Sequence, residues 1–383
     1  MRWIIGIIQH FRKRGDWVLL FLCLLATAFG LVVISSATNY WGNARFLTVQ
    51  LTATAMGVVC YILLTSIRMD TLAERQGLLF ALNTFLILLL IPFGYSGGTG
   101  NRSWLDLPGL PVNVQPAEIC KIIFTILLAK VMQIHQNKIS SPKAVVLMGF
   151  QLAFIVGLNM VISKDAGVSL IFVFIFLAMA FVGGVKPWWF LGGFAGIAAI
   201  TPYAWNNLMP EYMKERIQVL YDPTIDPQGL GPRWHIKRSL MSLTGGGLTG
   251  QGLFQGSRTQ IGALNAQHTD FVFSAIGEEL GLLGCAFTLI LLGAIVLRII
   301  YVALKTSDYL SRMICVGIAA AMIFQICVNV GMCLGVAPVI GLTLPFISYG
   351  GSSIVSMYLA MGVVSSIHAH PEGDRLGRYI RSR

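Results

Sequence analysis

The stretch DWVLLFLCLLATAFGLVVISS, residues 16–36, decides the fold class of this chain. Asp16 is its single charged residue, and a membrane-spanning helix needs about 20 predominantly apolar residues. Nine further stretches have the same character, at 46–66, 76–94, 114–134, 143–163, 166–184, 187–205, 271–302, 312–335 and 340–367, the last broken near its start by Pro345 and Gly350-Gly351. The sequence therefore predicts an all-α polytopic membrane protein with about ten transmembrane helices.

The composition agrees with a membrane location. Of the 383 residues, 56% are hydrophobic and 11% are charged, against roughly 25% charged residues in soluble domains. Lipid accepts apolar side chains on the outside of a helix bundle, whereas water does not. The composition excludes a soluble enzyme, a disordered protein and a DNA-binding module.

The net charge of +11 has a membrane interpretation as well. Basic residues concentrate at the two ends of the chain and in one long loop, which favours orientation and contact with anionic membrane lipids over nucleic acid. The seven cysteines all lie in apolar runs, so we interpret them as packing residues and not as a disulfide set or a zinc site.

Lys and Arg also predict the orientation of a single integral membrane domain, residues 1–383. Ten spans put both termini on one side, and the short loops of that side carry far more Lys and Arg than those of the other side. We therefore expect residues 1–15 to form an interfacial basic helix and 368–383 a cytoplasmic tail. Residues 206–270 form a long loop between spans 7 and 8 that faces outward, with short helices packed on the membrane surface.

Glu118 and Lys121 are charged residues inside the fourth predicted span, where each costs about 2.5–3.5 kcal/mol to insert. Their i, i+3 spacing places them on one helix face, so they can pair. The pair either ties helices together or lines a polar cavity. Gln115 and Pro116 just before it favour a cavity.

Asp270 stands where the long loop meets the eighth span, within HTDFVFSAIGEELG, residues 268–281. One interpretation is a helix cap that complements the helix dipole. The other is a general base, because the apolar face that follows would raise its pKa. Glu278 and Glu279 lie too deep in the span for capping.

Two further segments place polar groups at the outer face. Asn329 precedes GVAPVIGLTLPFISYGGSS, residues 335–353, whose glycine pair is either a simple kink or irregular backbone beside a cavity. Residues 164–167, Lys-Asp-Ala-Gly, form either a tight hairpin or part of the same site. The sequence carries no nucleotide-binding signature, so outward chemistry would need a substrate with its own energy, such as a lipid-borne sugar pyrophosphate.

These segments resemble the SEDS family (shape, elongation, division and sporulation), the RodA/FtsW/SpoVE group of bacterial peptidoglycan polymerases. The matching motifs follow one another along nearly the whole chain: Asn101-Arg102-Ser103-Trp104, QPAEICK at 115–121, Lys164-Asp165-Ala166-Gly167, GGGLTGQG at 245–252, HTDF at 268–271 with EELG at 278–281, and LPFISYGGSS at 344–353. Two positions depart from the family pattern. Asn265-Ala266 replaces a Pro-Glu pair, and Lys164 replaces a proline.

The resemblance implies an inverting glycosyltransferase that polymerises lipid II at the outer face of the bacterial cytoplasmic membrane, in elongation, division or sporulation. Asp270 is the candidate general base for the acceptor hydroxyl. The leaving pyrophosphate needs a divalent cation (Mg²⁺ or Mn²⁺) or Arg/Lys, and no organic cofactor. The outer cations are Arg102, Lys164, Lys214, Arg216, Arg233, Lys237, Arg238 and Arg258, of which Arg102 and Arg258 are preferred because each lies near a matching motif.

The remaining site residues are assigned to substrate binding or to the cavity wall: Glu118, Lys121, Lys164, Asp165, His268, Glu279, Ser348 and Ser352. The implied partners are lipid II, membrane lipids and a class B penicillin-binding protein for crosslinking, because this chain has no Ser-x-x-Lys in a soluble domain. The competing class is a lipid II flippase or another polytopic carrier, and a scaffold that recruits a partner is a third interpretation. We find no inverted repeat, and the polar residues cluster outside instead of at mid-membrane.

Overall fold

The computed structural model describes residues 2–42, 45–95, 101–105, 114–207, 209–227, 231–264 and 266–371. Residues 372–383 of the predicted tail, and Asn265, lie outside this set. Within it the fold is an all-α bundle with one two-residue β-ladder, Gly94–Tyr95 (β1) with Trp104–Leu105 (β2). The predicted class, an all-α polytopic membrane protein, is confirmed.

Each of the ten predicted stretches contains a long helix. Their bounds are α2 Trp17–Ala37, α3 Arg45–Thr65, α5 Gln76–Leu88 continued by α6 Leu90–Phe93, α7 Pro116–Ile134, α8 Pro142–Ile162, α9 Ala166–Val182, α10 Pro187–Asn207, α13 Val272–Lys305, α14 Tyr309–Cys333 and α15 Gly351–Ala369. Seven spans among the described residues are long and apolar enough to cross a membrane: α2, α3, α5 with α6, α8, α13, α14 and α15. The count of ten spans stays a prediction.

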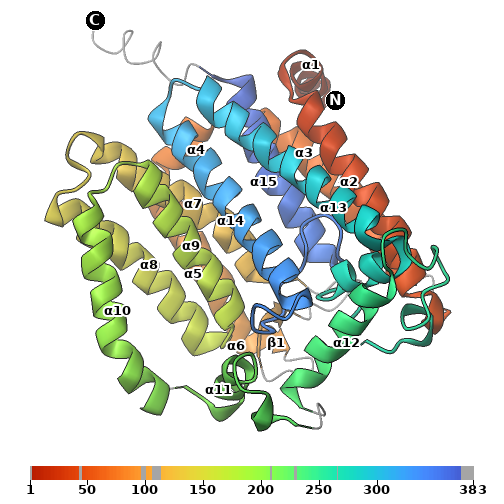
Figure 1. Cartoon of the computed structure of the whole chain (residues 1–383). Coiled ribbons are helices and arrows are strands. Elements are labelled where there is room, and N and C mark those ends of the chain that lie inside the picture. The colour runs from red at the N-terminus through yellow and green to blue at the C-terminus, as the bar shows by residue number, and fades with distance from the viewer. Residues whose placement is uncertain are drawn as a thin grey trace, which may run out of the picture.

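Shorter elements join these helices. They are α1 Arg2–Arg14, α4 Met69–Glu74, α11 Glu211–Gln218 and α12 Pro232–Gly245, with 3₁₀ turns at Asn39–Trp41, Gln136–Lys138, Pro223–Ile225 and Thr259–Ile261. The short helices expected in the 206–270 loop are therefore present as α11 and α12. In Figure 1 they lie at the end of the bundle opposite α1.

The start of the last predicted span is wrong. Helix α15 begins at Gly351, and residues 334–350 run as irregular backbone. Proline removes a backbone donor that a helix needs, and Gly335, Gly341 and Phe346 adopt positive φ angles of 71°, 72° and 64°. This segment therefore enters the bundle as a folded loop.

Close helix packing forms the centre of the bundle. Helices α3 and α15 make the most extensive helix–helix contact, and glycines make the approach possible. A Cβ atom on Gly57 would lie 2.8 Å from the Tyr358 ring, and one on Gly362 would lie 3.0 Å from the Tyr61 backbone. Helix α10, in contrast, has no buried residue and lies at the edge of the bundle (Figure 1).

The end of the bundle near α1 is held by an ion pair. Asp16 accepts a hydrogen bond from the Leu19 N–H at 3.0 Å, which caps α2, and it pairs with Arg298 of α13 at 2.9 Å. His10 of α1 stacks on His370, just after α15, with ring centroids 5.1 Å apart. Helix α1 and the end of α15 therefore lie together at this end.

Candidate active site

A cavity of about 650 Å³ opens at the other end of the bundle. Its wall comes from segments far apart in the sequence: 101–104, the first turn of α7, the α8–α9 turn, α11, α12, 266–271, α14 and 339–343. Asp270, Asp165 and Glu118 are the predicted site residues that line it. With Glu215 of α11, the fold brings four carboxyl groups from distant segments to one cavity.

Asp270 lies in the turn before α13, but it does not cap that helix. Phe271 occupies the N-cap position, and α13 has no side-chain cap there. Capping, one of the two interpretations from the sequence, therefore does not account for Asp270. Its side chain lies in the cavity wall, where it can meet a ligand.

The backbone around Asp270 is held from two sides. Asn329 of α14 donates from Nδ2 to the carbonyl oxygens of Asp270 and Leu342, at 2.8 and 2.7 Å. Ser348 donates from Oγ to the Thr269 carbonyl at 2.6 Å. Both contacts bind the turn to the irregular 334–350 segment, so that segment positions the carboxyl group.

The environment of Asp270 favours a general base. The pKa of Asp270 is raised to about 6, mainly by burial and in smaller part by the Asp165 carboxylate, while a Thr269 hydrogen bond and the Arg216 charge oppose the shift. A base is most effective when its pKa lies near the working pH. Asp270 meets that condition better than an ordinary surface aspartate.

Asp165 is the second carboxyl group of the cavity. It caps α9 by accepting from the Val168 N–H at 3.1 Å, and it accepts from Ser103 Oγ at 3.1 Å and Gln115 Nε2 at 3.4 Å. Burial raises the pKa of Asp165 and the Glu118 charge adds to this, although its hydrogen bonds oppose the shift. The α8–α9 hairpin is therefore part of the site.

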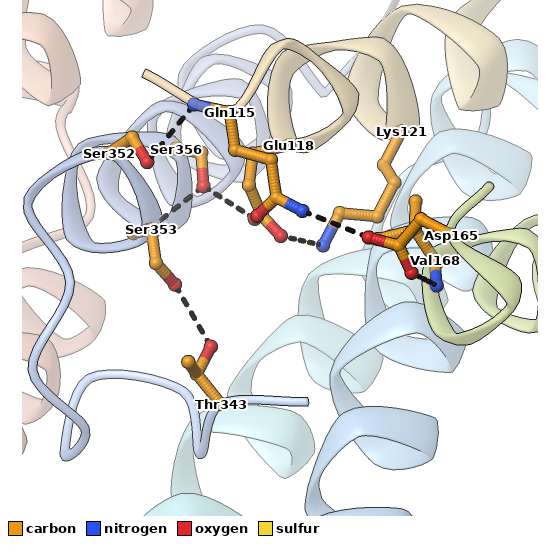
Figure 2. Close-up of polar contacts among 9 residues, drawn as sticks. All are labelled: Gln115, Glu118, Lys121, Asp165, Val168, Thr343, Ser352, Ser353 and Ser356. Atoms are coloured by element: carbon orange, nitrogen blue, oxygen red, sulfur yellow. Dashed lines mark hydrogen bonds and ion pairs between the residues drawn. The ribbon is translucent and has the colours of Figure 1, made fainter. Parts of the chain in front are cut away.

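Glu118 and Lys121 form the expected pair, with 2.8 Å between Lys121 Nζ and Glu118 Oε1. The other Glu118 oxygen accepts from Ser356 Oγ of α15 at 2.8 Å. Figure 2 shows Glu118 between Lys121 and Ser356, with Gln115 reaching toward Asp165. Both interpretations from the sequence hold here, because the pair joins α7 to α15 and Glu118 also lines the cavity.

His268 lies behind the cavity wall and does not line the cavity. Its ring contacts those of Trp41, Phe46 and Tyr349, with centroids 5.0, 5.1 and 5.6 Å away. Burial lowers the pKa of His268 to about 4, so the ring is neutral at physiological pH. The His268 carbonyl accepts from the Tyr349 N–H at 2.8 Å, which fixes the turn before Asp270.

Glu278 belongs to a second site, which we call the glycine clasp: the 246–262 segment packed on the first part of α13. The buried Glu278 carboxylate accepts four hydrogen bonds, from Ser257 Oγ, the Arg258 N–H, and the N–H and Oγ1 of Thr259, at 2.7 to 3.2 Å. Glu279 next to it accepts from Ser36 Oγ and Gln260 Nε2, each at 2.8 Å. Neither lines the cavity, so the assignment of Glu279 to the cavity is not supported.

The glycine clasp also supplies backbone hydrogen-bond partners where α13 is interrupted. Gly281 has non-helical angles, φ 64° and ψ −161°, inside the helix. The N–H groups of 251–252 donate to the carbonyls of 278–279, and those of 282–283 donate to the carbonyls of 247–248, at 2.9 to 3.2 Å. The glycine motif and the EELG motif are therefore two halves of one structural unit.

The preferred phosphate-binding cations do not line the cavity. Arg102 and Lys164 are exposed and absent from its lining, and Arg258 of the glycine clasp donates from its guanidinium to the Met241 carbonyl of α12 at 2.9 Å. Ser352 accepts from the Gln115 N–H at 3.3 Å and, like Ser348, supports the wall from behind.

The cavity holds residues that sequence motifs did not single out. Arg216 of α11, His235 of α12 and Gln325 of α14 all line it. The Oε1 atom of Gln325 and the Nδ1 atom of His235 are buried, and neither has a hydrogen-bond partner among the described residues. Arg216 was one of eight outer cations, and no local pattern separates it from the others. Its presence in the cavity lining depends on the position of α11 in the folded protein.

The family profile for FtsW, RodA and SpoVE, described as cell cycle protein, matches residues 16–373. The chain belongs to this family. It is 30% identical to the peptidoglycan glycosyltransferase MrdB of Escherichia coli K12 over 93% of this chain and 94% of the relative. It is 31% identical to the stage V sporulation protein E of Bacillus subtilis over 93% of this chain and 97% of that protein.

A solved structure has the same fold. It comes from work on how a peptidoglycan synthase complex coordinates polymerization and crosslinking, and the matched chain gives a TM-score of 0.78 at 29% identity. The match covers 92% of this chain and 97% of the other. The resemblance that the motifs indicated is confirmed, and the chain is a multi-pass membrane protein of this family.

Proposed function

We propose that this protein is a peptidoglycan glycosyltransferase that polymerises lipid II into glycan strands at the outer face of the bacterial cytoplasmic membrane. The observation that carries the proposal is Asp270, a carboxyl group with a raised pKa in the wall of a cavity at one end of the bundle. The names of the relatives support the reaction class.

The cavity suits the reacting groups of such a substrate. Ligand pockets of about 300–1,000 Å³ bury most of a drug-sized molecule, and this cavity measures about 650 Å³. Sugar and phosphate groups fit that volume, while the polyprenyl chain and the peptide stay outside. The acceptor 4-hydroxyl attacks the anomeric carbon from the face opposite the diphosphate, and Asp270 takes the hydroxyl proton. The outcome is inversion at that carbon.

The proposed topology has ten spans with both termini in the cytoplasm. The Lys and Arg asymmetry supports it, and so does the location of α1 and the end of α15 at the end of the bundle away from the cavity (Figure 1). The 206–270 loop then faces outward. Helix α1, with Arg12, Lys13 and Arg14 in its last turn, would lie on the inner membrane surface near anionic lipids.

We also propose that a divalent cation, Mg²⁺ or Mn²⁺, binds together with the substrate diphosphate. The described residues contain no group of three or more His, Cys, Asp or Glu placed to hold a metal ion. Mg²⁺ is commonly held by one or two carboxylates together with substrate phosphates, and Asp165 is the carboxylate available for that arrangement. A bound cation would supply charge neutralisation at the diphosphate. Loss of activity on chelation, restored by added Mg²⁺, would test this.

The proposed partner is a class B penicillin-binding protein that crosslinks the new strands. The matched solved chain belongs to a complex that couples polymerization with crosslinking, which supports such a partner. Co-purification of the two proteins from the native membrane, and faster polymerisation when the partner is added, would test the pairing.

The deciding experiment supplies purified protein with lipid II, with and without its partner, and measures glycan chains on gels. Wild-type protein should polymerise, and Asp270→Asn should lose about 10²–10⁴ in rate, the usual contribution of a general base. Asp222→Asn is the matched control, because Asp222 lies in an exposed turn of the same loop. Near-normal synthesis by folded Asp270→Asn would remove Asp270 from the mechanism. Lipid II transport into vesicles without glycan synthesis would favour the flippase class.

A further inference from the structure

The charges on the cavity wall are arranged asymmetrically. Glu118 and Asp165, from α7 and the α8–α9 turn, lie on the bundle side together with Asp270. Helices α11 and α12 of the long loop supply Glu215, Arg216 and His235. Among the described Lys and Arg residues, Arg216 is the one that lines this cavity. An anionic part of a substrate is therefore attracted to the Arg216 side chain.

Arg216 is held where it can act on the reacting groups. Its Nη1 donates to the Val339 carbonyl at 3.1 Å, in the irregular segment that also supplies Gly341. A Cβ atom on Gly341 would lie 3.5 Å from Asp270 Oδ2, so this segment runs from Arg216 to the base. The Arg216 charge also acts on the Asp270 carboxyl group and lowers its pKa.

His235 lies on the same side of the cavity. Its ring stacks on Phe271, the residue after Asp270, with centroids 5.7 Å apart and planes 5° apart. Burial lowers the pKa of His235, and the charges of Arg216 and Arg238 lower it further. The ring is therefore neutral at physiological pH and keeps one N–H. Its buried Nδ1 has no partner within the described structure, so a ligand can complete its hydrogen bonding.

We infer that Arg216 and His235 form the binding site for the diphosphate of the lipid-linked donor. This inference rests on the proposed function. A planar guanidinium matches phosphate oxygens in a two-point contact, and the imidazole adds one N–H donor. The sugar then extends from the diphosphate toward Asp270.

The reaction balances with these groups. The acceptor oxygen forms a bond to the anomeric carbon as the bond from that carbon to the diphosphate oxygen breaks. The electron pair of the broken bond stays on the diphosphate, and the acceptor proton moves to the Asp270 carboxylate. Arg216 stabilises the negative charge that grows on the leaving group, which is a transition-state interaction. The long loop therefore supplies the leaving-group site, and the bundle supplies the base.

The test uses full-length protein in detergent and the variants Arg216→Gln, Arg216→Lys and His235→Gln. Lys214→Gln is the matched control, because Lys214 lies on the same helix and pairs with exposed Glu211 away from the cavity lining. One readout is the rate of lipid II polymerisation, with kcat and KM separated. The other is binding of geranylgeranyl diphosphate against the monophosphate, followed by thermal shift or calorimetry. The second readout needs no catalysis.

We expect Arg216→Gln to lower kcat about 10²–10³-fold, the range found when one transition-state donor is removed. It should also abolish the preference for diphosphate over monophosphate. Arg216→Lys should recover part of both effects, because it restores a point charge, and His235→Gln should weaken diphosphate binding less. Lys214→Gln should match wild type.

Unchanged diphosphate binding and a rate within twofold of wild type for folded Arg216→Gln would overturn the inference. Two further outcomes separate it from the proposed function. Wild-type protein that binds diphosphate through Arg216 but makes no glycan supports the binding site and contradicts the polymerase. Active wild-type protein whose rate and diphosphate binding are unaffected by Arg216→Gln supports the polymerase and contradicts this site.

Discussion

Asp270 and Glu278 lie on one short stretch of chain, yet the structure treats the two carboxyl groups in opposite ways. The Glu278 carboxylate is buried in the glycine clasp and accepts four hydrogen bonds. Asp270 lies in the cavity wall, and its pKa is raised to about 6 by burial. A carboxylate surrounded by donors is stabilised as a charge and is inert, whereas one short of donors holds a proton readily. The number of donors, not the position in the motif, separates the structural group from the proposed base.

Glu118 extends this comparison, because it lines the cavity and yet is fully paired. Lys121 and Ser356 each contact one of its oxygens at 2.8 Å. By the same reasoning Glu118 is a structural group that shapes the cavity wall. Four predictions test the comparison, in order of decreasing effect.

The largest effect is expected from breaking the Glu118–Lys121 pair. Removing one partner leaves a buried charge alone, which costs about 3–5 kcal/mol of unfolding free energy, while the double variant Glu118→Gln/Lys121→Met should lose less than the sum of the singles. Unfolding in detergent measures this. The control is Glu211–Lys214, which has the same i, i+3 spacing and a 2.7 Å contact but a Glu211 side chain that is 79% exposed. Its loss should be about 0.5 kcal/mol or less. Additive losses at the buried pair would contradict the prediction.

Glu278→Gln should come next, at about 2–4 kcal/mol of destabilisation. The amide removes the charge and turns an N–H₂ group toward donors that need an acceptor. The loss of activity should follow the loss of folded protein, since Glu278 does not touch the cavity lining. Thermal unfolding and rate per folded molecule measure the two effects separately. A normal melting temperature together with a large fall in rate would show that Glu278 takes part in the reaction.

The sequence was sufficient for the architecture because that depends on apolar runs about 20 residues long. It was also sufficient for Asp270, Asp165 and the Glu118–Lys121 pair, since charges next to or inside apolar spans are few and costly. The sequence did not predict which residues line the cavity where this depends on the direction of a side chain. Glu279 and Arg258 belong to or lie near matching motifs, but Glu279 bonds to Gln260 of the glycine clasp and Arg258 to the Met241 carbonyl of α12.

Arg216 shows the second limit of the sequence. It lies on α11, an eight-residue helix in the long loop, where no periodic pattern fixes the direction of a side chain relative to the bundle. Only the path of residues 334–350, which brings the Val339 carbonyl to Arg216, identifies it among eight cations. Local sequence does not encode that long-range contact.

Asp270→Asn should have the opposite effect on stability from Glu278→Gln. Because the folded-state pKa of Asp270 is raised to about 6, protonation favours the folded state. That stability is present below the pKa of an unfolded aspartate, about 3.9, and is lost as pH rises through about 6. At pH 8 the neutral amide should therefore stabilise the protein by about 1–3 kcal/mol. At pH 4 the two melting temperatures should converge. A variant less stable than wild type at pH 8 would assign Asp270 a structural role.

The smallest effect concerns the pH dependence of the rate, which reports Asp270 directly. The base must be deprotonated, so activity should rise about tenfold per pH unit below the pKa and level off above about 6. Acid unfolding through Asp270 does not explain such a fall, since its protonation stabilises the folded state, and melting temperatures at each pH serve as the control. The neighbouring charges predict shifts of opposite sign. Arg216→Gln removes a charge that lowers this pKa and should move the midpoint up, whereas Asp165→Asn removes one that raises it and should move the midpoint down. If both variants moved the midpoint in the same direction, or left it unchanged, the titrating group would not be the Asp270 carboxyl between these two charges.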